Sequence, residues 1–427
     1  MPVGSNQKQR FIGLEWLRFL MGMYVAVYHT AHMYFPDDGS LQWLRDATSM
    51  GFFATSTFFV LSGFLLAHVY FVDNRLREPA PSFWLKRLAN LYPIHVFSLI
   101  LTIAVLLTMQ YLAIPPDGPK ASIRFVIFDT NEVLAREQPE LFHHYMSNWE
   151  LALNSVLQLT LLHAWNPFYL TFNAPLWSIS ALFFFYLMFP LLGPRLMASP
   201  HPWKLLVLVG ALYLIPPLFV IWHQDYGIPF TGLIHRFPLF RLPEFLAGIL
   251  VYSIFRHQQA ASALPGIPLR AGMILYVGVS FIIGTALFTH GPKFWYYLLH
   301  NGLLLPAQLM LVYLTALMGE PTSNGLRRWL PRFGAASLSI FVLHVPLSAL
   351  FRTIEKLLLG NFPQCFTDWD SCIAAAGAAE NTLSGYFIFL ALLIVASVLF
   401  QERLVVPTRK WLISRLSKRV AAPATQP

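Results

Sequence analysis

The sequence predicts an all-α protein that crosses a membrane about ten times and keeps both termini in the cytoplasm. Of its 427 residues, 56% are hydrophobic and 11% are charged, whereas about a quarter of the residues in soluble domains are charged. Apolar runs of about 20 residues, enough to cross a hydrocarbon core of roughly 30 Å, recur along the whole chain. Basic residues gather in alternate connecting segments. We therefore expect a single membrane-embedded domain over residues 1–427, with its core at about 11–405.

The ten predicted membrane-spanning helices share this length and contain few charges. They cover about residues 11–35, 51–72, 90–113, 174–192, 205–222, 238–255, 271–289, 294–318, 333–351 and 383–400. An eleventh run, about 149–170, is shorter in its apolar part, so we expect an interfacial or re-entrant helix there. The first run is too long and too charged for a cleaved signal peptide. The basic stretch within 406–427 predicts a cytoplasmic tail that lies on the anionic inner leaflet.

The distribution of Lys and Arg predicts the orientation of these helices. With the N-terminus inside, the cytoplasmic segments hold 19 basic residues and the external segments hold 8. Because basic residues stay on the cytoplasmic side, this count favours a multi-pass protein of the plasma membrane, in bacteria the inner membrane. The net charge of +9 therefore reflects insertion and does not indicate a nucleic-acid partner. The oligomeric state is left open.

Two cysteines fall in the last external segment. Cys365 and Cys372 are seven residues apart, and a disulfide between them would suit an oxidising compartment. The alternative is two unrelated free thiols.

The first predicted helix carries charged and titratable residues on one face. Arg18 and His29 are eleven residues apart, which is about three helical turns and a rise of about 16 Å. Glu15 lies on the same face and can pair with Arg18. Ionisable residues inside a membrane are functional candidates by default, although Arg18 could instead snorkel to the interface and His29 could be a hydrogen-bonded interfacial residue. His32, one turn further out, remains without a role.

A second group of polar residues opens the third helix, within the stretch FWLKRLANLYPIH. Lys86 and Arg87 stand at its cytoplasmic entrance, and Tyr92 follows. Topology alone predicts basic residues here. The functional alternative is that they bind phosphate groups.

Later helices contribute further candidates. Trp177 and Ser180 begin the fourth predicted helix, where an indole and a hydroxyl could contact a sugar, although an aromatic belt also accounts for the indole. Arg241 and Glu244 are three residues apart and can pair on one helix face. His344 falls midway along the ninth helix. No metal-binding signature, phosphate-binding glycine loop or nucleophile elbow occurs in the chain, so we expect no metal and no permanently bound cofactor.

The order of these motifs resembles one known family. An Arg and a His separated by ten residues are followed by FFVLSGFLL, KRLANLYPIH, PLWSISALFFFYLMFPLL, RLPEFLAGILVY and SLSIFVLHVPL. This set is similar to the acyltransferase-3 family of integral membrane O-acyltransferases and spans about 11–405. The resemblance implies transfer of an acyl group, acetyl or succinyl, from acyl-CoA to a carbohydrate such as lipopolysaccharide or exopolysaccharide. It implies His29 and Arg18 as the essential pair.

The sequence departs from the family pattern at two places. Leu182 and Phe183 stand where the family often has carboxylates, and Asn90 stands where it often has a second Arg. Glu244 could supply the missing acid from another helix, or the chain could act on a different acceptor.

These residues suggest a mechanism. A sugar hydroxyl needs a base, and a desolvated, neutral histidine can accept its proton. We expect Lys86, Arg87, Tyr92 and Arg18 to bind the cytoplasmic donor, and Trp177, Ser180, Arg241 and Glu244 to hold the acceptor or the oxyanion. Glu15 and His344 would support them. Direct transfer and an acyl-histidine intermediate both remain open, as do two other classes: a flippase for a lipid-linked saccharide and a non-catalytic member of a polysaccharide assembly complex.

Overall fold

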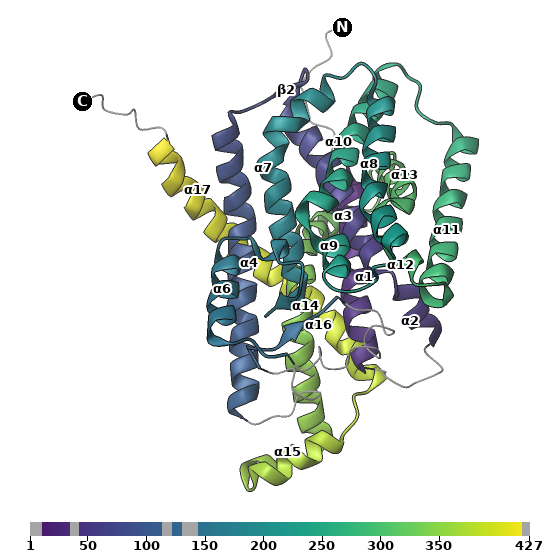
Figure 1. The fold of residues 1–427 in the computed structure, drawn as a ribbon. Coiled ribbons are helices and arrows are strands. Elements are labelled where there is room, and N and C mark those ends of the chain that lie inside the picture. Colours follow the sequence, from purple (N-terminus) through teal and green to yellow (C-terminus); the bar gives the residue numbers. More distant parts are fainter. Residues whose placement is uncertain (1–10, 35–41, 113–121, 130–143, 421–427) are drawn as a thin grey trace.

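The computed structural model describes residues 11–34, 42–112, 122–129 and 144–420. Helices account for nearly all of the regular structure (Figure 1). The described strands form only two short antiparallel pairs, β1 (Phe71–Val72) with β2 (Arg75–Leu76) and β3 (Val126–Ile127) with β4 (Leu170–Thr171).

The long helices lie over the predicted spans, and α4 and α14 extend well beyond theirs. They are α1 (Ile12–Tyr34), α3 (Gly51–Tyr70), α4 (Ala80–Tyr111), α7 (Trp177–Met197), α8 (Pro202–His223), α10 (Pro238–Ala260), α11 (Ile267–His290), α14 (Asn324–Leu359) and α16 (Leu383–Phe400). Within the described residues, nine helical runs are long and apolar enough to cross a membrane, and they correspond to nine of the ten predicted spans. The remaining prediction is α1, whose 23 residues extend over about 34 Å. The all-α polytopic fold is therefore confirmed.

One predicted helix is broken. Residues 294–318 form α12 (Phe294–Leu298), a π-helical turn η6 (Leu299–Leu303) and α13 (Leu305–Ala316). Asn301 and Gly302 leave helical geometry, with Gly302 at φ 106°. Irregular backbone at membrane depth is tolerated where protein buries it, and Asn301 is fully buried. The predicted span is therefore present, as Phe294–Ala316, but its helix is interrupted at Asn301 and Gly302.

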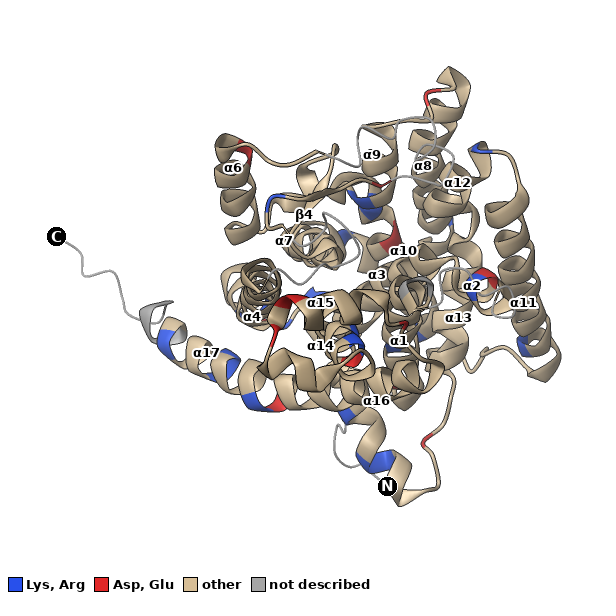
Figure 2. Cartoon of the chain, turned by 90° about the horizontal axis from the view of Figure 1, so that it is seen from below, with Lys and Arg blue, Asp and Glu red and all other residues tan. Residues whose placement is uncertain are grey.

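Close helix contacts build the centre of the bundle. Helix α1 packs chiefly on α14 and α3, and α3 packs on α10; these four lie together in the middle of the view from below (Figure 2). Gly63 of α3 faces the Phe245 carbonyl of α10, while Gly248 of α10 faces the Val60 carbonyl of α3. A Cβ atom at either glycine would overlap the opposite backbone, so small residues allow this approach.

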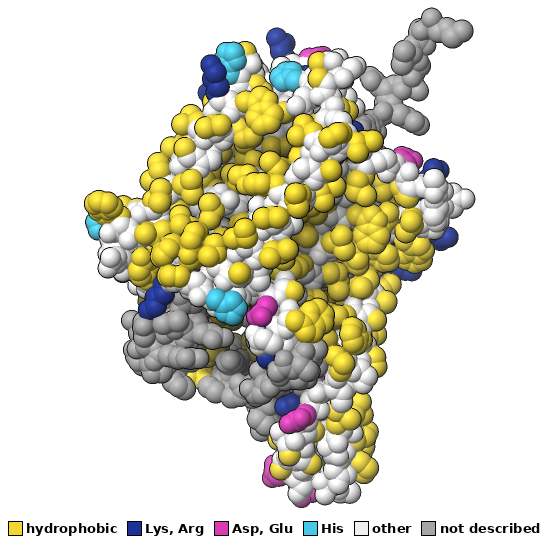
Figure 3. Space-filling view, turned by 90° about the vertical axis from the view of Figure 1, so that its right-hand side faces the viewer, with side chains coloured by type: hydrophobic (Ala, Val, Ile, Leu, Met, Phe, Trp, Pro, Cys, Tyr) yellow, Lys and Arg dark blue, Asp and Glu magenta, His cyan; other side chains and the backbone are white. Residues whose placement is uncertain are grey.

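The outer face of the bundle is apolar. Helix α11 exposes aliphatic side chains such as Ile274, Leu275 and Ile282, and Figure 3 shows hydrophobic side chains spread across this side of the molecule. Because water penalises such a surface and lipid does not, it fits a membrane-facing wall.

The run predicted as interfacial forms a short helix, α6 (Asn148–Leu159). Its 12 residues are too few to cross a bilayer. Ser147 and Glu150 form a capping box at its start, and Trp149, Val156 and Leu159 are exposed. A 3₁₀ turn, η4 (His163–Trp165), follows.

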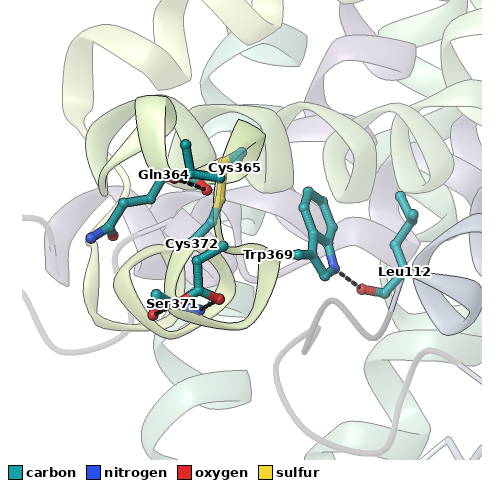
Figure 4. The surroundings of a disulfide bond; sticks show 8 residues. Leu112, Gln364, Cys365, Trp369, Ser371 and Cys372 are labelled. Atoms are coloured by element: carbon teal, nitrogen blue, oxygen red, sulfur yellow. Dashed lines mark hydrogen bonds between the residues drawn. A yellow bond between two sulfur atoms is a disulfide. The ribbon is translucent and has the colours of Figure 1, made fainter.

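The segment predicted to be the last external one contains a disulfide. Cys365 is bonded to Cys372 at the start of α15 (Trp369–Ala378), as Figure 4 shows. The Trp369 indole N–H donates to the Leu112 carbonyl at 2.8 Å. The free-thiol alternative is therefore excluded, and the segment is tied to the end of α4.

The chain after α16 continues as η8 (Gln401–Val405) and then α17 (Val406–Val420). Helix α17 packs beside α4 and carries several of the Lys and Arg positions coloured blue in Figure 2. The predicted basic tail is thus a helix that contacts the bundle.

Candidate functional site

Helices α1 and α14 bring two histidines together. The His29 and His344 rings are stacked, with 5.2 Å between centroids and 18° between planes. His344 is fully buried, and its Nδ1 lies 3.2 Å from the Ile340 carbonyl oxygen. If Nδ1 carries the proton for that contact, Nε2 keeps a lone pair, which is the form a general base requires. The Tyr28 ring lies 4.7 Å from His29.

The same two helices position the ion pair of α1. The Arg18 guanidinium lies 3.6 Å from the Glu15 carboxylate, and both side chains are about one quarter exposed. Gly334 of α14 sits against Glu15, where a Cβ atom would lie 2.8 Å from the Glu15 Cβ and 2.9 Å from its carbonyl oxygen. A glycine is therefore needed at this crossing. The predicted pair of Glu15 and Arg18 is present. It lies on the same face of α1 as His29, about three helical turns away.

A basic pocket opens between α4 and α17. Its volume is about 340 Å³. Side chains of both helices line it: Lys86, Arg87, Arg409, Lys410, Ile413 and Ser414. Two of the four bases were predicted as donor-binding residues, and the other two come from the stretch predicted only to anchor the tail.

Neighbouring groups hold the bases of α4 in place. Lys86 pairs with Glu78. Burial alone would raise the pKa of the Glu78 carboxyl, but hydrogen bonds from Lys86 and Ser82 outweigh it and hold that pKa below its usual range. Glu78 is therefore ionised at neutral pH. Arg87 donates to the Tyr70 hydroxyl at 2.7 Å and lies over the Tyr70 ring at 5.0 Å.

An aromatic residue links this pocket to α1. Tyr186 of α7 interacts electrostatically with both Arg87 and Arg18. The Trp84 indole of α4 donates to the Tyr186 carbonyl at 3.1 Å. Tyr186 is thus near both Arg87 of the basic pocket and Arg18 of α1.

A buried polar network surrounds the break at Asn301. Arg241 and Glu244 are fully buried and lie 3.1 Å apart, as the sequence predicted. Arg241 has three further acceptors: Ser56 Oγ at 2.6 Å, the His300 carbonyl at 2.9 Å and Asn301 Oδ1 at 3.2 Å. Tyr213 donates to Glu244 at 2.5 Å and contacts the His300 carbonyl at 3.1 Å. A broken helix is typical of carriers, but here the chain's own side chains bind the freed carbonyl.

Aromatic contacts join Trp177 to this network. Its ring lies 5.8 Å from Phe59 and 4.9 Å from His235 of the short helix α9 (Phe230–Arg236). Arg241 lies 5.8 Å from the Phe59 ring, and the rings of His235 and His300 are 5.5 Å apart.

Several members of the network were missed from the sequence. They are Ser56, Tyr213, His235, His300 and Asn301. Ser56 lies between two threonines and His300 is adjacent to Asn301, but no spacing pairs any of the five with Arg241. The only signal in the sequence was the presence of polar residues inside otherwise apolar spans.

Two predicted residues make contacts elsewhere. The Ser180 hydroxyl donates to the Leu161 carbonyl at 2.6 Å and accepts from the Ala164 amide at 3.2 Å. The Tyr92 hydroxyl donates to the Leu159 carbonyl at 3.2 Å and does not line the basic pocket. Both side chains hold the end of α6 and the turn after it. The side chain of His32 lies outside the described residues.

Leu182, one of the positions that depart from the family pattern, lines a small apolar cavity. Leu182 meets Thr55 and Phe58 of α3, Ser178 of α7 and Phe341 of α14 there. The Phe341 ring is 6.2 Å from His344. Leu182 therefore faces the region beside the histidine pair. Over the part of the chain that the structure describes, no three His, Cys, Asp or Glu side chains form a group that could hold a metal ion.

Comparison with known proteins agrees with this architecture. The family profile described as "Acyltransferase domain" matches residues 11–402. "Acyltransferase MdmB" of Streptomyces mycarofaciens is 28% identical over 186 residues, which is 43% of this chain and 39% of that protein. "Protein 2 in picA locus" of Rhizobium radiobacter is 30% identical over 181 residues, 42% of this chain and 76% of that protein. No solved structure matches. Because the profile spans nearly the whole chain, the protein belongs to the acyltransferase-3 family of membrane acyltransferases.

Proposed function

We propose that this acyltransferase moves an acetyl or succinyl group from acyl-CoA to a hydroxyl of a cell-surface or exported carbohydrate, and that it works in the bacterial inner membrane. The observation that carries the proposal is the stacked pair of His29 and His344. It places a half-buried base, His29, on the same helix wall as Arg18 and packs it against the fully buried His344, within a family of acyltransferases.

In the proposed reaction, His29 acts as the general base. Its imidazole accepts the proton of the sugar hydroxyl while the oxygen attacks the thioester carbonyl. The tetrahedral intermediate then expels the CoA thiolate, which takes up the proton from the imidazolium. One C–O bond forms and one C–S bond breaks. His344 stacks on the ring that becomes charged and fixes its orientation.

The donor would enter from the cytoplasmic side. The phosphate groups of acyl-CoA carry negative charge, and Lys86 and Arg87 line the basic pocket at this end. An extended pantetheine arm can cover much of the rise of about 16 Å between Arg18 and His29. The pocket, Tyr186 and Arg18 thus support an inward route for the thioester.

The acceptor would approach from the opposite side, where Trp177 is buried against Phe59 and His235 and would form the wall behind the sugar. Arg241 and Glu244 have their charges satisfied inside the protein. We propose that they hold the broken helix and the wall beside Trp177 in place, rather than contacting the sugar directly.

The surface polysaccharide of the host cell tests the acceptor assignment. Its mass spectrum is compared between cells with the wild-type protein, cells without it and cells with His29→Gln. We expect one additional mass, that of an acetyl or succinyl group, in wild-type cells alone. Equal spectra from wild-type and His29→Gln cells, at equal protein levels, would contradict the proposal. A vesicle assay that follows both the saccharide and acyl-CoA distinguishes the acyltransferase from a carrier. A carrier would move the saccharide across the membrane without consuming acyl-CoA.

A further inference from the structure

Helix α17 supplies half of the basic residues of the pocket. We infer that α17 forms one wall of the binding site for the nucleotide phosphates of acyl-CoA, and that Arg409 completes this site. The identity of the ligand rests on the function proposed above. The site itself rests on the geometry of α4 and α17.

The position of Arg409 is fixed by α4. Its Nη1 donates to the Asn90 side-chain oxygen at 3.1 Å. Asn90 follows Arg87 by three residues, so the two share one face of α4. The hydrogen bond therefore places a third guanidinium or ammonium group on the face that already carries Lys86 and Arg87.

The charge of the pocket suits a ligand with several phosphates. Four bases line it, and one carboxylate, that of Glu78, pairs with Lys86. The nucleotide of CoA carries a diphosphate and a 3′-phosphate, whereas a common lipid headgroup offers a single phosphodiester. Arg binds phosphate oxygens in a bidentate manner and Lys as a point charge. Two of each around about 340 Å³ fit the nucleotide better than the single phosphate.

Arg87 has unused donor capacity on this wall. Its Nε is buried and has no hydrogen-bond partner among the described residues. A buried donor without a partner is costly, and a phosphate oxygen would satisfy it. Since Arg87 also interacts with Tyr186, a ligand bound here would start the route toward Arg18.

The test measures binding of adenosine 3′,5′-bisphosphate by calorimetry to the full-length protein in phosphatidylcholine nanodiscs. Arg409→Gln should weaken binding at least about tenfold, because it removes a charge-assisted hydrogen bond. Arg409→Lys should recover part of the affinity. Arg415→Gln is the matched control, because Arg415 lies on the same helix over Trp411 and does not line the pocket. It should bind as wild type does.

Three outcomes would overturn the inference. One is an affinity of Arg409→Gln within twofold of wild type, and another is equal weakening by Arg415→Gln. The third combines two observations: phosphatidylglycerol abolishes nucleotide binding, and the same lipid stabilises the wild-type protein but not Arg409→Gln. This result would assign the pocket to a lipid headgroup. Acyl transfer is measured separately. If Arg409→Gln transfers the acyl group with an unchanged KM for acyl-CoA, the proposed site is refuted and the proposed function is not. If the wild-type protein binds the nucleotide but transfers no acyl group, the proposed function is refuted and the site is not.

Discussion

Replacing Arg241 by Met should destabilise the protein strongly. Arg241 is fully buried, and its guanidinium contacts Ser56 Oγ at 2.6 Å, the His300 carbonyl at 2.9 Å, Asn301 Oδ1 at 3.2 Å and the Glu244 carboxylate at 3.1 Å. Met keeps much of the side-chain volume but removes every one of these donors. The helix break and a buried carboxylate then lose their main partner.

The expected loss follows from the buried charge. Removing one partner of a buried ion pair costs about 3–5 kcal/mol. The Tyr213 hydrogen bond to Glu244 at 2.5 Å remains, so we expect a value toward the lower end of this range. Adding Glu244→Gln to Arg241→Met should recover part of the loss, because the uncompensated charge disappears.

Arg332→Met is the matched control for this experiment. Arg332 also forms an ion pair, with Glu402 at 2.6 Å, but both side chains are about one third exposed. Exposed pairs contribute about 0–1 kcal/mol. The free energy of unfolding is measured by denaturant titration in mixed micelles. Equal stability of Arg241→Met and Arg332→Met would refute the assignment of Arg241 to a structural network.

Three further predictions concern residues away from this network. Ser180→Ala should lower stability by about 1–2 kcal/mol in the same titration and leave acyl transfer unchanged, because the hydroxyl binds backbone groups. Replacing Cys365 and Cys372 by Ser should cost about 2–3 kcal/mol, because the bridge spans only seven positions and the loop-closure entropy is correspondingly small; thermal unfolding measures this. A backbone hydrogen bond from Ser147 lowers the pKa of Glu150 from 4.5 to about 2, so protection of α6 from hydrogen exchange should be complete above about pH 4.5 and fall toward pH 2.

Each of these predictions has a result that contradicts it. Loss of transfer by a stable Ser180→Ala protein would return Ser180 to the acceptor site. An unchanged melting temperature after removal of both thiols would show that the disulfide adds no stability. For α6, Glu150→Gln serves as the control, and it should abolish the pH dependence between 4.5 and 2; an equal dependence in both proteins would assign it to another group.

Much of the fold was predictable because a membrane restricts the choices. Spanning segments must be helical, apolar and about 20 residues long, so hydropathy located them, although α4 begins ten residues before its predicted span and α14 begins nine residues before and ends eight residues after its own. The break at Asn301 was not predictable in this way. A single Gly in an apolar run is compatible with a continuous helix, and the partners that stabilise the break come from α3, α8 and α10.

Sequence spacing predicted which site residues lie together on one helix, but not which residues of different helices come together. Helical spacing placed Glu15, Arg18 and His29 on one wall and paired Arg241 with Glu244. Spacing says nothing about which helix packs opposite. The stacking of His344 on His29 and the approach of Arg409 to Asn90 therefore required the tertiary structure.

We propose that His29 accepts the proton in acyl transfer, and the transfer rate of the purified protein in nanodiscs measures this role. The substrates are radiolabelled acetyl-CoA and polysaccharide extracted from the host cell. Transfer is measured as release of the CoA thiol together with the appearance of label on the polysaccharide. His29→Ala should lower the rate at least about 100-fold, as expected for loss of a general base. His290→Ala, at the exposed end of α11, should behave as wild type does. A His29→Ala rate within threefold of wild type, at equal stability, would show that His29 is not the general base.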